Sequence, residues 1–108
     1  MSKPWPPPPD MASIQELVAT ADVEGFIAEG SPTDEYETEA ELLFAQVEHF
    51  TTDELISVKL VPILQDIWER SFELDQSAIA KRQPKLQELA GQIERFFGPE
   101  AKPQVRGA

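Results

Sequence analysis

The apolar side chains of this chain recur every three or four residues, the spacing that places them on one face of an α-helix. The clearest series is Leu60, Ile63, Leu64, Ile67 and Trp68. No stretch alternates apolar and polar residues for long enough to indicate a β-strand. The sequence therefore predicts an all-α fold, a compact array of four to five helices.

The spacing of the apolar residues, and the points where glycine, proline or polar residues interrupt it, indicate where each helix is expected. A short turn is expected over 22–30, where Gly30 followed by Pro32 is typical of a helix end. The longer helical segments are expected at 11–20, 34–48, 51–72 and 75–97. We expect a core that includes Phe26, Phe44, Ile63, Leu64, Trp68, Leu89, Ile93 and Phe97.

Several residues are suited to start or interrupt these helices. Asp10 and Asp22 can each accept backbone hydrogen bonds at a helix start. Thr51 followed by Glu54 forms a capping box. Pro62 lacks an N–H group and clashes with the preceding turn of a helix. We therefore expect a kink or break just before Pro62.

Composition divides the chain into three parts. Residues 1–10 are rich in proline, which favours an extended backbone, and are expected to form a flexible, disordered tail. Residues 11–98 are expected to form a single helical domain, large enough to fold without disulfides. Residues 99–108 are expected to form a flexible C-terminal tail.

The net charge is −11, and it is unevenly distributed along the chain. Thirteen acidic residues, and neither Lys nor Arg, lie between Lys3 and Lys59. This negative field disfavours binding to nucleic acid or to an anionic membrane, because both require clustered cations. It permits a basic protein partner. Solubility alone is the other interpretation of the charge.

The chain has no cysteine, so it has neither disulfides nor thiolate metal ligands. No apolar run approaches the roughly 20 residues that span a bilayer. The first residues lack the apolar segment of a secretory signal. A cytoplasmic location is expected from these features.

The segment 34–48 places much of the acidic charge on one predicted helix. At about 100° per residue, Tyr36 falls with the apolar stripe of that helix, and Glu35 and Glu39 lie on one flank of it. The other flank carries an acidic ridge that consists of Asp34, Glu37, Glu41 and Glu48.

This arrangement favours a protein-binding module, immunity-like or regulatory, that presents an acidic helix face to a basic partner. Tyr36 is suited to anchor such an interface, although packing in the core is the alternative for it. The expected contact set is Asp34, Glu35, Tyr36, Glu37, Glu41 and Glu48. A second interpretation is an oligomer-forming structural protein with no ligand site, in which the apolar face of residues 60–72 forms a homodimer interface.

The residues that usually carry catalysis are scarce. With no cysteine and His49 as the only histidine, nucleophile–base pairs are hard to assemble. The acidic run lacks the glycine of a calcium loop, and no Glu-x-x-His pair is present for a di-iron site. We therefore expect no enzyme activity, no catalytic residue, no metal and no cofactor.

The stretch DVEGFIAEGSPTDEYETEAE, residues 22–41, resembles the YugE-like family of small bacterial proteins of unknown function. The family pattern is close to D-P-E-G-L-I-x-x-G-A-P-x-D-E-Y-D-x-E. The chain departs from it at Val23, in place of proline, and at Glu37, in place of aspartate. The resemblance implies a compact helical fold and brings no catalytic residue or ligand. The matching residues are Asp22, Glu24, Gly25, Ile27, Gly30, Pro32, Asp34, Glu35, Tyr36 and Glu39.

Overall fold

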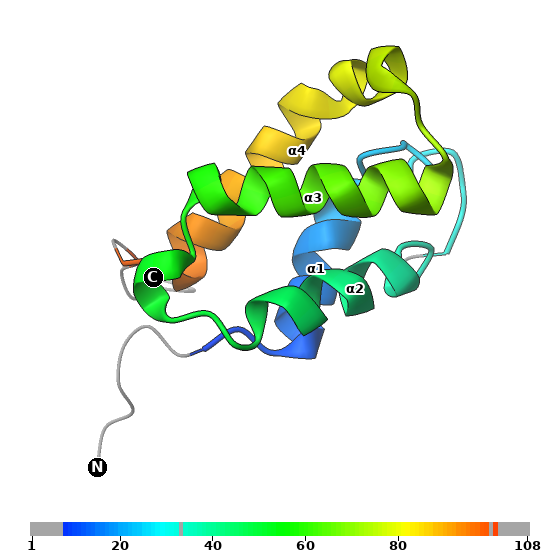
Figure 1. Ribbon diagram of the computed structural model, residues 1–108. Coiled ribbons are helices and arrows are strands. Elements are labelled where there is room, and N and C mark those ends of the chain that lie inside the picture. Colours follow the sequence, from blue (N-terminus) through cyan, green and yellow to red (C-terminus); the bar gives the residue numbers. More distant parts are fainter. Residues whose placement is uncertain (1–7, 33, 100, 102–108) are drawn as a thin grey trace.

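A computed structural model describes residues 8–32, 34–99 and 101 (Figure 1). Within these residues it contains four α-helices, a 3-10 turn and no strand, which confirms the all-α prediction. The elements are α1 (Met11–Ala21), α2 (Glu37–Val47), η1 (Thr52–Glu54), α3 (Ser57–Phe72) and α4 (Gln76–Phe97). The tails predicted for 1–10 and 99–108 fall mainly outside the described residues.

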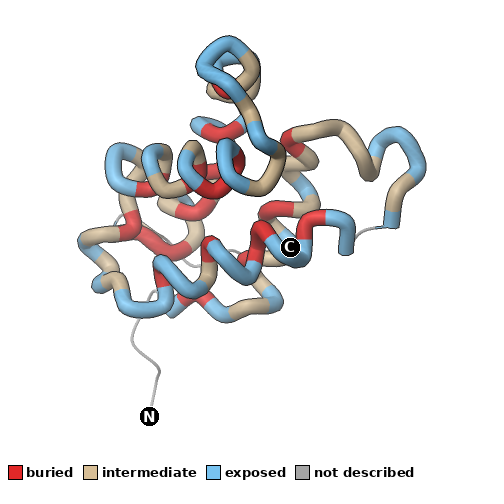
Figure 2. Tube along the Cα trace, turned by 45° about the vertical axis from the view of Figure 1, so that its right-hand side comes forward, coloured by how far each residue is buried: buried red, intermediate tan, exposed pale blue. Residues whose placement is uncertain are grey.

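The four helices enclose one core. α3 packs against α4 and α2, and α1 packs against α2 and α4. Figure 1 shows α3 running across the molecule, with α4 crossing behind it and α2 below it. Buried positions recur along one side of each helix in Figure 2, as the apolar spacing predicts. The fully buried side chains include Ile14, Val18, Leu43, Leu60, Leu64, Trp68, Leu86, Leu89 and Ile93.

Most of the predicted core is confirmed. Leu64, Trp68, Leu89 and Ile93 are fully buried, and Phe97 is 8% exposed. The other three predicted core residues, Phe26, Phe44 and Ile63, are partly buried and pack against the edge of the core. Burial is thus not set by helical phase alone, since Ile63 belongs to the apolar series of α3 and is only partly buried, and Phe26 lies in a loop.

Of the kink or break expected just before Pro62, the break is absent. α3 continues through Pro62, and α4 likewise continues through Pro84. The chain breaks earlier, at Leu55 and Ile56, which separate η1 from α3. Pro62 removes the donor for the carbonyl group of Val58, and Val58 is 73% exposed. Water can reach that carbonyl group, so the lost hydrogen bond does not require a break.

The expected caps are mostly present. The carboxylate of Asp10 accepts from the backbone N–H of Ser13 at 2.7 Å and starts α1. The capping box of Thr51 and Glu54 is formed, but it starts the short turn η1 and not the long helix. Asp22 was expected to start a helix, and instead it ends α1. The segment after it forms hydrogen-bonded turns, which confirms the short turn expected over 22–30.

α2 begins at Glu37, three residues later than the start predicted near Asp34. Asp34 to Tyr36 form a turn, in which the N–H of Glu37 donates to the carbonyl oxygen of Asp34 at 3.0 Å. No side chain caps the helix at Tyr36. The Tyr36 side chain instead turns back toward the end of α1, where its hydroxyl group donates to Asp22 at 2.6 Å.

The far end of α4 closes against the start of α3. The carboxylate of Glu94 accepts from the backbone N–H of Ser57, the first residue of α3, at 2.7 Å. Gly98 follows, where a Cβ atom would lie 2.6 Å from the carbonyl oxygens of both Leu55 and Glu94. Only glycine fits this approach, which explains why α4 ends there.

In the part of the chain that the structure describes, none of the helices combines the length and apolar character needed to cross a membrane.

Candidate functional site

The loop between α1 and α2 is organised around Asp22. The backbone of Asp22 is left-handed, with φ of 45°. Its carboxylate accepts hydrogen bonds from the backbone N–H groups of Ile27 at 3.1 Å and Ala28 at 2.9 Å. It also accepts from the hydroxyl group of Tyr36 at 2.6 Å. One side chain therefore fixes the loop to both of the helices that it connects.

The same loop directs Glu24 toward α3 and α4. The Glu24 carboxylate accepts from the indole N–H of Trp68 at 3.0 Å and from two guanidinium nitrogens of Arg82 at 2.9 and 2.8 Å. The Glu24 side chain is only 6% exposed, and that of Arg82 is 27% exposed. Arg82 also donates to the carbonyl oxygen of Ala78 at 3.1 Å, which orients its guanidinium. This ion pair ties the loop to the two C-terminal helices.

Aromatic rings surround these polar contacts. Tyr36 stacks on Phe26 and on Trp68, with ring centroids 6.0 and 6.2 Å apart. Phe72 completes the group, 5.8 Å from Trp68 and 6.0 Å from Phe26. These distances are typical of favourable aromatic pairs. We call Asp22, Glu24, Tyr36, Trp68 and Arg82 the loop cluster.

Tyr36 is not available for a partner. It is 1% exposed, and its hydroxyl group also accepts from the backbone N–H groups of Glu24 at 3.0 Å and Phe26 at 3.4 Å. Its inclusion in the predicted contact set is therefore wrong, and the alternative of core packing holds. The Tyr36 hydroxyl group and the Asp22 carboxylate are hydrogen-bonded to each other in a partly buried site, so the ring lies toward the interior.

A direct optical titration can test the state of Tyr36, which is the only tyrosine of the chain. Burial, together with the hydrogen bond to Asp22, raises the pKa of Tyr36 to about 12. Its ultraviolet phenolate band is expected to appear near pH 12 in the folded protein and near pH 10 in urea, about the ordinary value. Because the folded pKa is the higher one, the stability due to Tyr36 is full below about pH 10 and is lost toward pH 12. A folded-state midpoint at the urea value would contradict the buried position.

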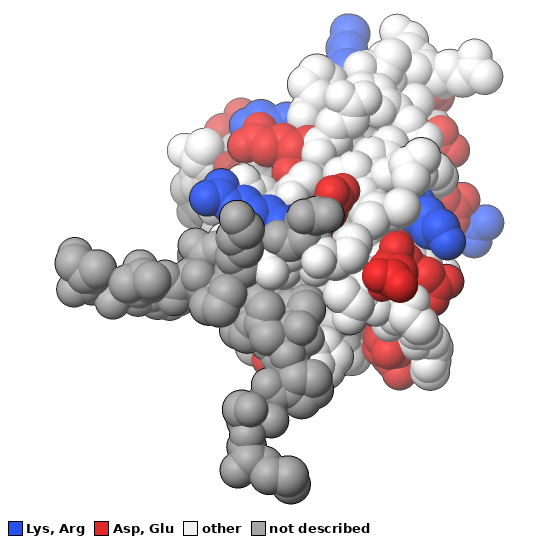
Figure 3. Space-filling model, turned by 90° about the vertical axis from the view of Figure 1, so that its left-hand side faces the viewer, with Lys and Arg blue, Asp and Glu red and all other residues white. Residues whose placement is uncertain are grey.

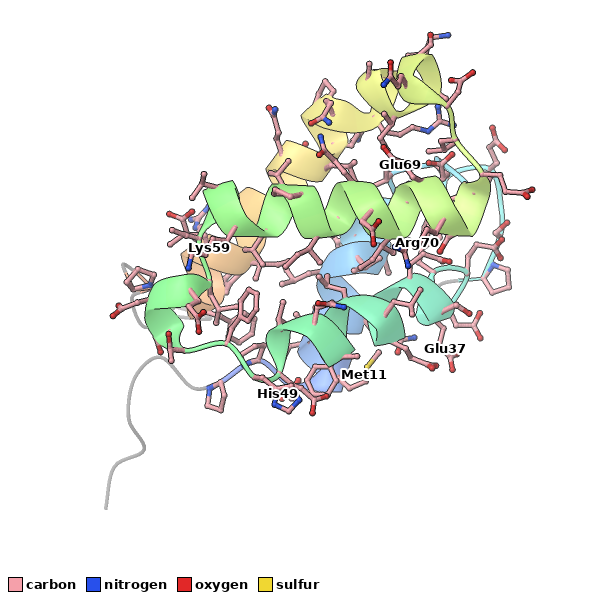
Figure 4. The ribbon with its side chains drawn as sticks, viewed as in Figure 1. Met11, Glu37, His49, Lys59, Glu69 and Arg70 are labelled. Carbon is pink, nitrogen blue, oxygen red and sulfur yellow. The ribbon has the colours of Figure 1, made fainter. Side chains whose placement is uncertain are left out.

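The other five members of the contact set are exposed. Glu37 and Glu41 lie on α2, and the remaining three lie in the turn before it or just beyond its end. Figure 4 shows Glu37 and His49 at opposite ends of α2, along its outer edge. The structure therefore leaves five carboxylates exposed on α2 and directly beside its two ends, those of Asp34, Glu35, Glu37, Glu41 and Glu48.

These five carboxylates have no Lys or Arg as an ion-pair partner among the described residues. Glu48 lies 3.5 Å from the ring of His49, and among the described residues no Lys or Arg pairs with any of the five. The end of the molecule that carries η1 differs, since Figure 3 shows Lys and Arg side chains beside acidic ones there. The negative charge along α2 is thus not neutralised within the described chain.

The described residues assemble no cluster of metal ligands. No group of three or more His, Asp or Glu side chains in the described part of the chain is placed to hold a metal ion. A shallow hollow of about 460 Å³ runs beside α1, where Glu16 is its only titratable side chain. The hollow is lined by Ala12, Gln15, Glu16, Ala19, Thr20 and Ile27.

The sequence reasoning missed Glu24 and Arg82 as a pair. They are 58 positions apart, so no local spacing links them. One signal was present, because Glu24 is an acidic residue within the turn segment 22–30 and has no basic residue near it in sequence. A charged residue in a turn that has no opposite charge nearby in the sequence indicates an ion-pair partner from a distant part of the chain.

Comparisons of the chain with protein-family models, with curated proteins and with solved structures gave no match.

Proposed function

We propose that this protein is a small acidic helical module that binds a basic protein partner through the outer face of α2. The observation that carries the proposal is the row of exposed carboxylates along α2 and its flanking turns, with no Lys or Arg of the described chain paired to them. A partner with a basic surface would meet these carboxylates and be selected by charge. The proposed contact residues are Asp34, Glu35, Glu37, Glu41 and Glu48.

The folding energetics support this proposal. Glu37 and Glu41 are like charges one helical turn apart, which destabilises a helix by a few tenths of a kcal/mol. Acidic residues in the first turn regain a similar amount from the helix dipole. Folding alone therefore gives little reason for the acidic ridge, whereas recognition of a basic partner does.

The proposal predicts a salt-sensitive interaction. Immobilised protein is expected to capture a basic protein from bacterial lysate at low salt, and capture is expected to fall when ionic strength reaches about 0.5 M, since charges are then screened within a few Å. Replacing both Glu37 and Glu41 with glutamine is expected to weaken capture about tenfold, with an unchanged helical circular dichroism signal. Each lost rim contact is worth about 0.5–1 kcal/mol.

A matched control separates the position of the charge from its amount. Glu69 on α3 and Glu88 on α4 are also exposed carboxylates, and changing both to glutamine alters the net charge equally. This control is expected to leave capture nearly unchanged. Equal weakening by both double variants, or capture that does not respond to salt, would rule out α2 as the contact surface.

We further propose that the protein belongs to the YugE-like family of bacterial proteins and resides in the cytoplasm. The stretch 22–41 supports the first statement, because the loop cluster draws Asp22, Glu24 and Tyr36 from it. The absence of cysteine supports the second.

The homodimer interpretation loses its original basis. It relied on the apolar face of residues 60–72, yet Leu60, Leu64 and Trp68 are fully buried within a single chain. That face does not require a second copy to cover it. The binding-module proposal is therefore the one that the geometry favours.

A further inference from the structure

A second strip of α2 faces α3 and differs from the acidic ridge. Glu39, Leu42 and Gln46 follow one another at three and four residues, so they share one side of the helix. Across from Gln46 lie Pro62 and Ile67 of α3, with Ile63 between them. We call these six residues the α2–α3 seam.

Glu39 is an unusual member of this seam. It is 7% exposed and is the one buried charged residue among those described. In the described structure it makes no hydrogen bond and no ion pair. Its oxygen atoms still touch solvent, because no enclosed side-chain oxygen is left without a hydrogen bond. The stem of Glu39 is thus buried, while its charged tip reaches the surface without an ion-pair partner among the described residues.

A cation is present nearby but is engaged elsewhere. Figure 4 shows Arg70 on the part of α3 next to the beginning of α2. Arg70 pairs with Asp66 at 3.1 Å, and both side chains are largely exposed. The carboxylate of Glu39 is thus left open to a cation from outside the chain.

An apolar hollow lies farther along the same seam. Its volume is about 220 Å³, and it is lined by Gln46, Pro62, Ile63, Asp66 and Ile67. Pockets for small-molecule ligands are larger, roughly 300–1,000 Å³. This hollow therefore suits one aliphatic side chain of a macromolecule. Leu42, 45% exposed, lies between Glu39 and the hollow and extends the apolar surface.

We propose that the α2–α3 seam receives an amphipathic cationic helix of the basic partner, which seats an apolar side chain in the hollow and a Lys or Arg against Glu39. This inference rests on the proposed function and specifies the partner. Glu39 and Gln46 are seven residues apart, about 10 Å along α2. Two turns of a partner helix span the same distance, so a cation and an apolar residue at i and i+7 match both features.

Charge selects this occupant over a second copy of the chain. A second copy carries the same net charge of −11 and would bring its own carboxylates to the seam. No Lys or Arg occurs on α2 to receive them. A helix with a lysine beside an apolar stripe meets Glu39 and the hollow together.

The test uses two synthetic 14-residue peptides of leucine and lysine with identical composition. In one the leucines follow helical spacing and form an apolar face, and in the other they are scattered. Calorimetric titration at low salt is expected to show at least about tenfold tighter binding of the amphipathic peptide, the effect of burying one leucine-sized side chain.

Variants of seam residues then test whether the preference for the amphipathic peptide arises at the α2–α3 seam. Glu39→Gln and Leu42→Ser are each expected to reduce the difference between the peptides about threefold or more. Val58→Ser is the matched control, since Val58 is the other exposed large apolar residue, at 73%, and lies about 140° around α3 from Ile63. This control is expected to keep the preference. Thermal melting checks folding, and Glu39→Gln is expected to melt no lower than the wild type.

The outcomes separate this inference from the proposed function. Equal binding of both peptides, weakened by the Glu37 and Glu41 changes, overturns the seam and leaves the acidic face in place. A preference that survives both seam variants also overturns the seam. Failure of both peptides to bind at low salt overturns both proposals. Sedimentation that shows a dimer, made monomeric by Leu42→Ser, assigns the seam to a second copy instead.

Discussion

Replacing Arg82 with methionine is expected to lower the free energy of unfolding by about 3 kcal/mol. Methionine keeps much of the length of the side chain but removes both hydrogen bonds to Glu24. The Glu24 carboxylate, 6% exposed, would then remain buried with only the indole N–H of Trp68 as a partner. Urea denaturation followed by circular dichroism measures the change.

Two comparisons test that explanation. Changing Glu24 to glutamine in the Arg82→Met background is expected to recover part of the loss, because a neutral amide is less costly to bury than a charge. Arg70→Met removes an exposed pair with Asp66 and is expected to cost less than about 1 kcal/mol. If Arg82→Met and Arg70→Met lowered the free energy of unfolding by similar amounts, the buried ion pair with Glu24 would contribute no more than an exposed pair.

Asp22→Ala is the second change with a large expected effect, a loss of about 2 kcal/mol or more. It removes the acceptor for two backbone N–H groups and for the hydroxyl group of Tyr36, and each unsatisfied buried group costs about 1–3 kcal/mol. Alanine also tolerates the left-handed backbone at this position, φ 45°, less well than aspartate does. Asn is the matched replacement, since it tolerates that backbone and keeps one acceptor oxygen.

The same residue predicts a dependence on pH. Burial alone raises the pKa of Asp22, but the hydrogen bonds from Tyr36, Ala28 and Ile27, together with the charge of Lys85, outweigh it and hold the pKa below its ordinary value. The stabilisation is therefore full above the unfolded pKa and is lost as pH falls through the folded pKa. Asp22→Asn is expected to flatten the fall in stability at acid pH. If Asp22→Asn left the fall in the free energy of unfolding at acid pH unchanged, the stabilisation assigned to the Asp22 carboxylate would be contradicted.

Features set by nearby residues were predictable from the sequence. The helical spacing located four helices, and Asp10 caps α1 as expected because its partner, Ser13, is three residues away. The box of Thr51 and Glu54 formed for the same reason. The exposure of the five carboxylates on and around α2 also followed from phase along one helix.

Features set by distant contacts were not predictable in this way. The start of α3 depends on Glu94, which is 37 residues beyond Ser57, so Pro62 proved a poor guide to the break. The start of α2 depends on Tyr36 meeting Asp22. Glu39 was placed on a flank of the stripe by its phase, but only the packing of α3 beside it determines that it is buried.

α4, which is synthesised after the other three helices, completes contacts that they leave open. Arg82 supplies the counter-charge of Glu24, and Glu94 supplies the acceptor for the start of α3. A chain that is still growing and ends before α4 thus holds an unpaired carboxylate and an uncapped helix. Stable tertiary structure of these four helices is consequently expected only once α4 has been made, as one cooperative step rather than helix by helix.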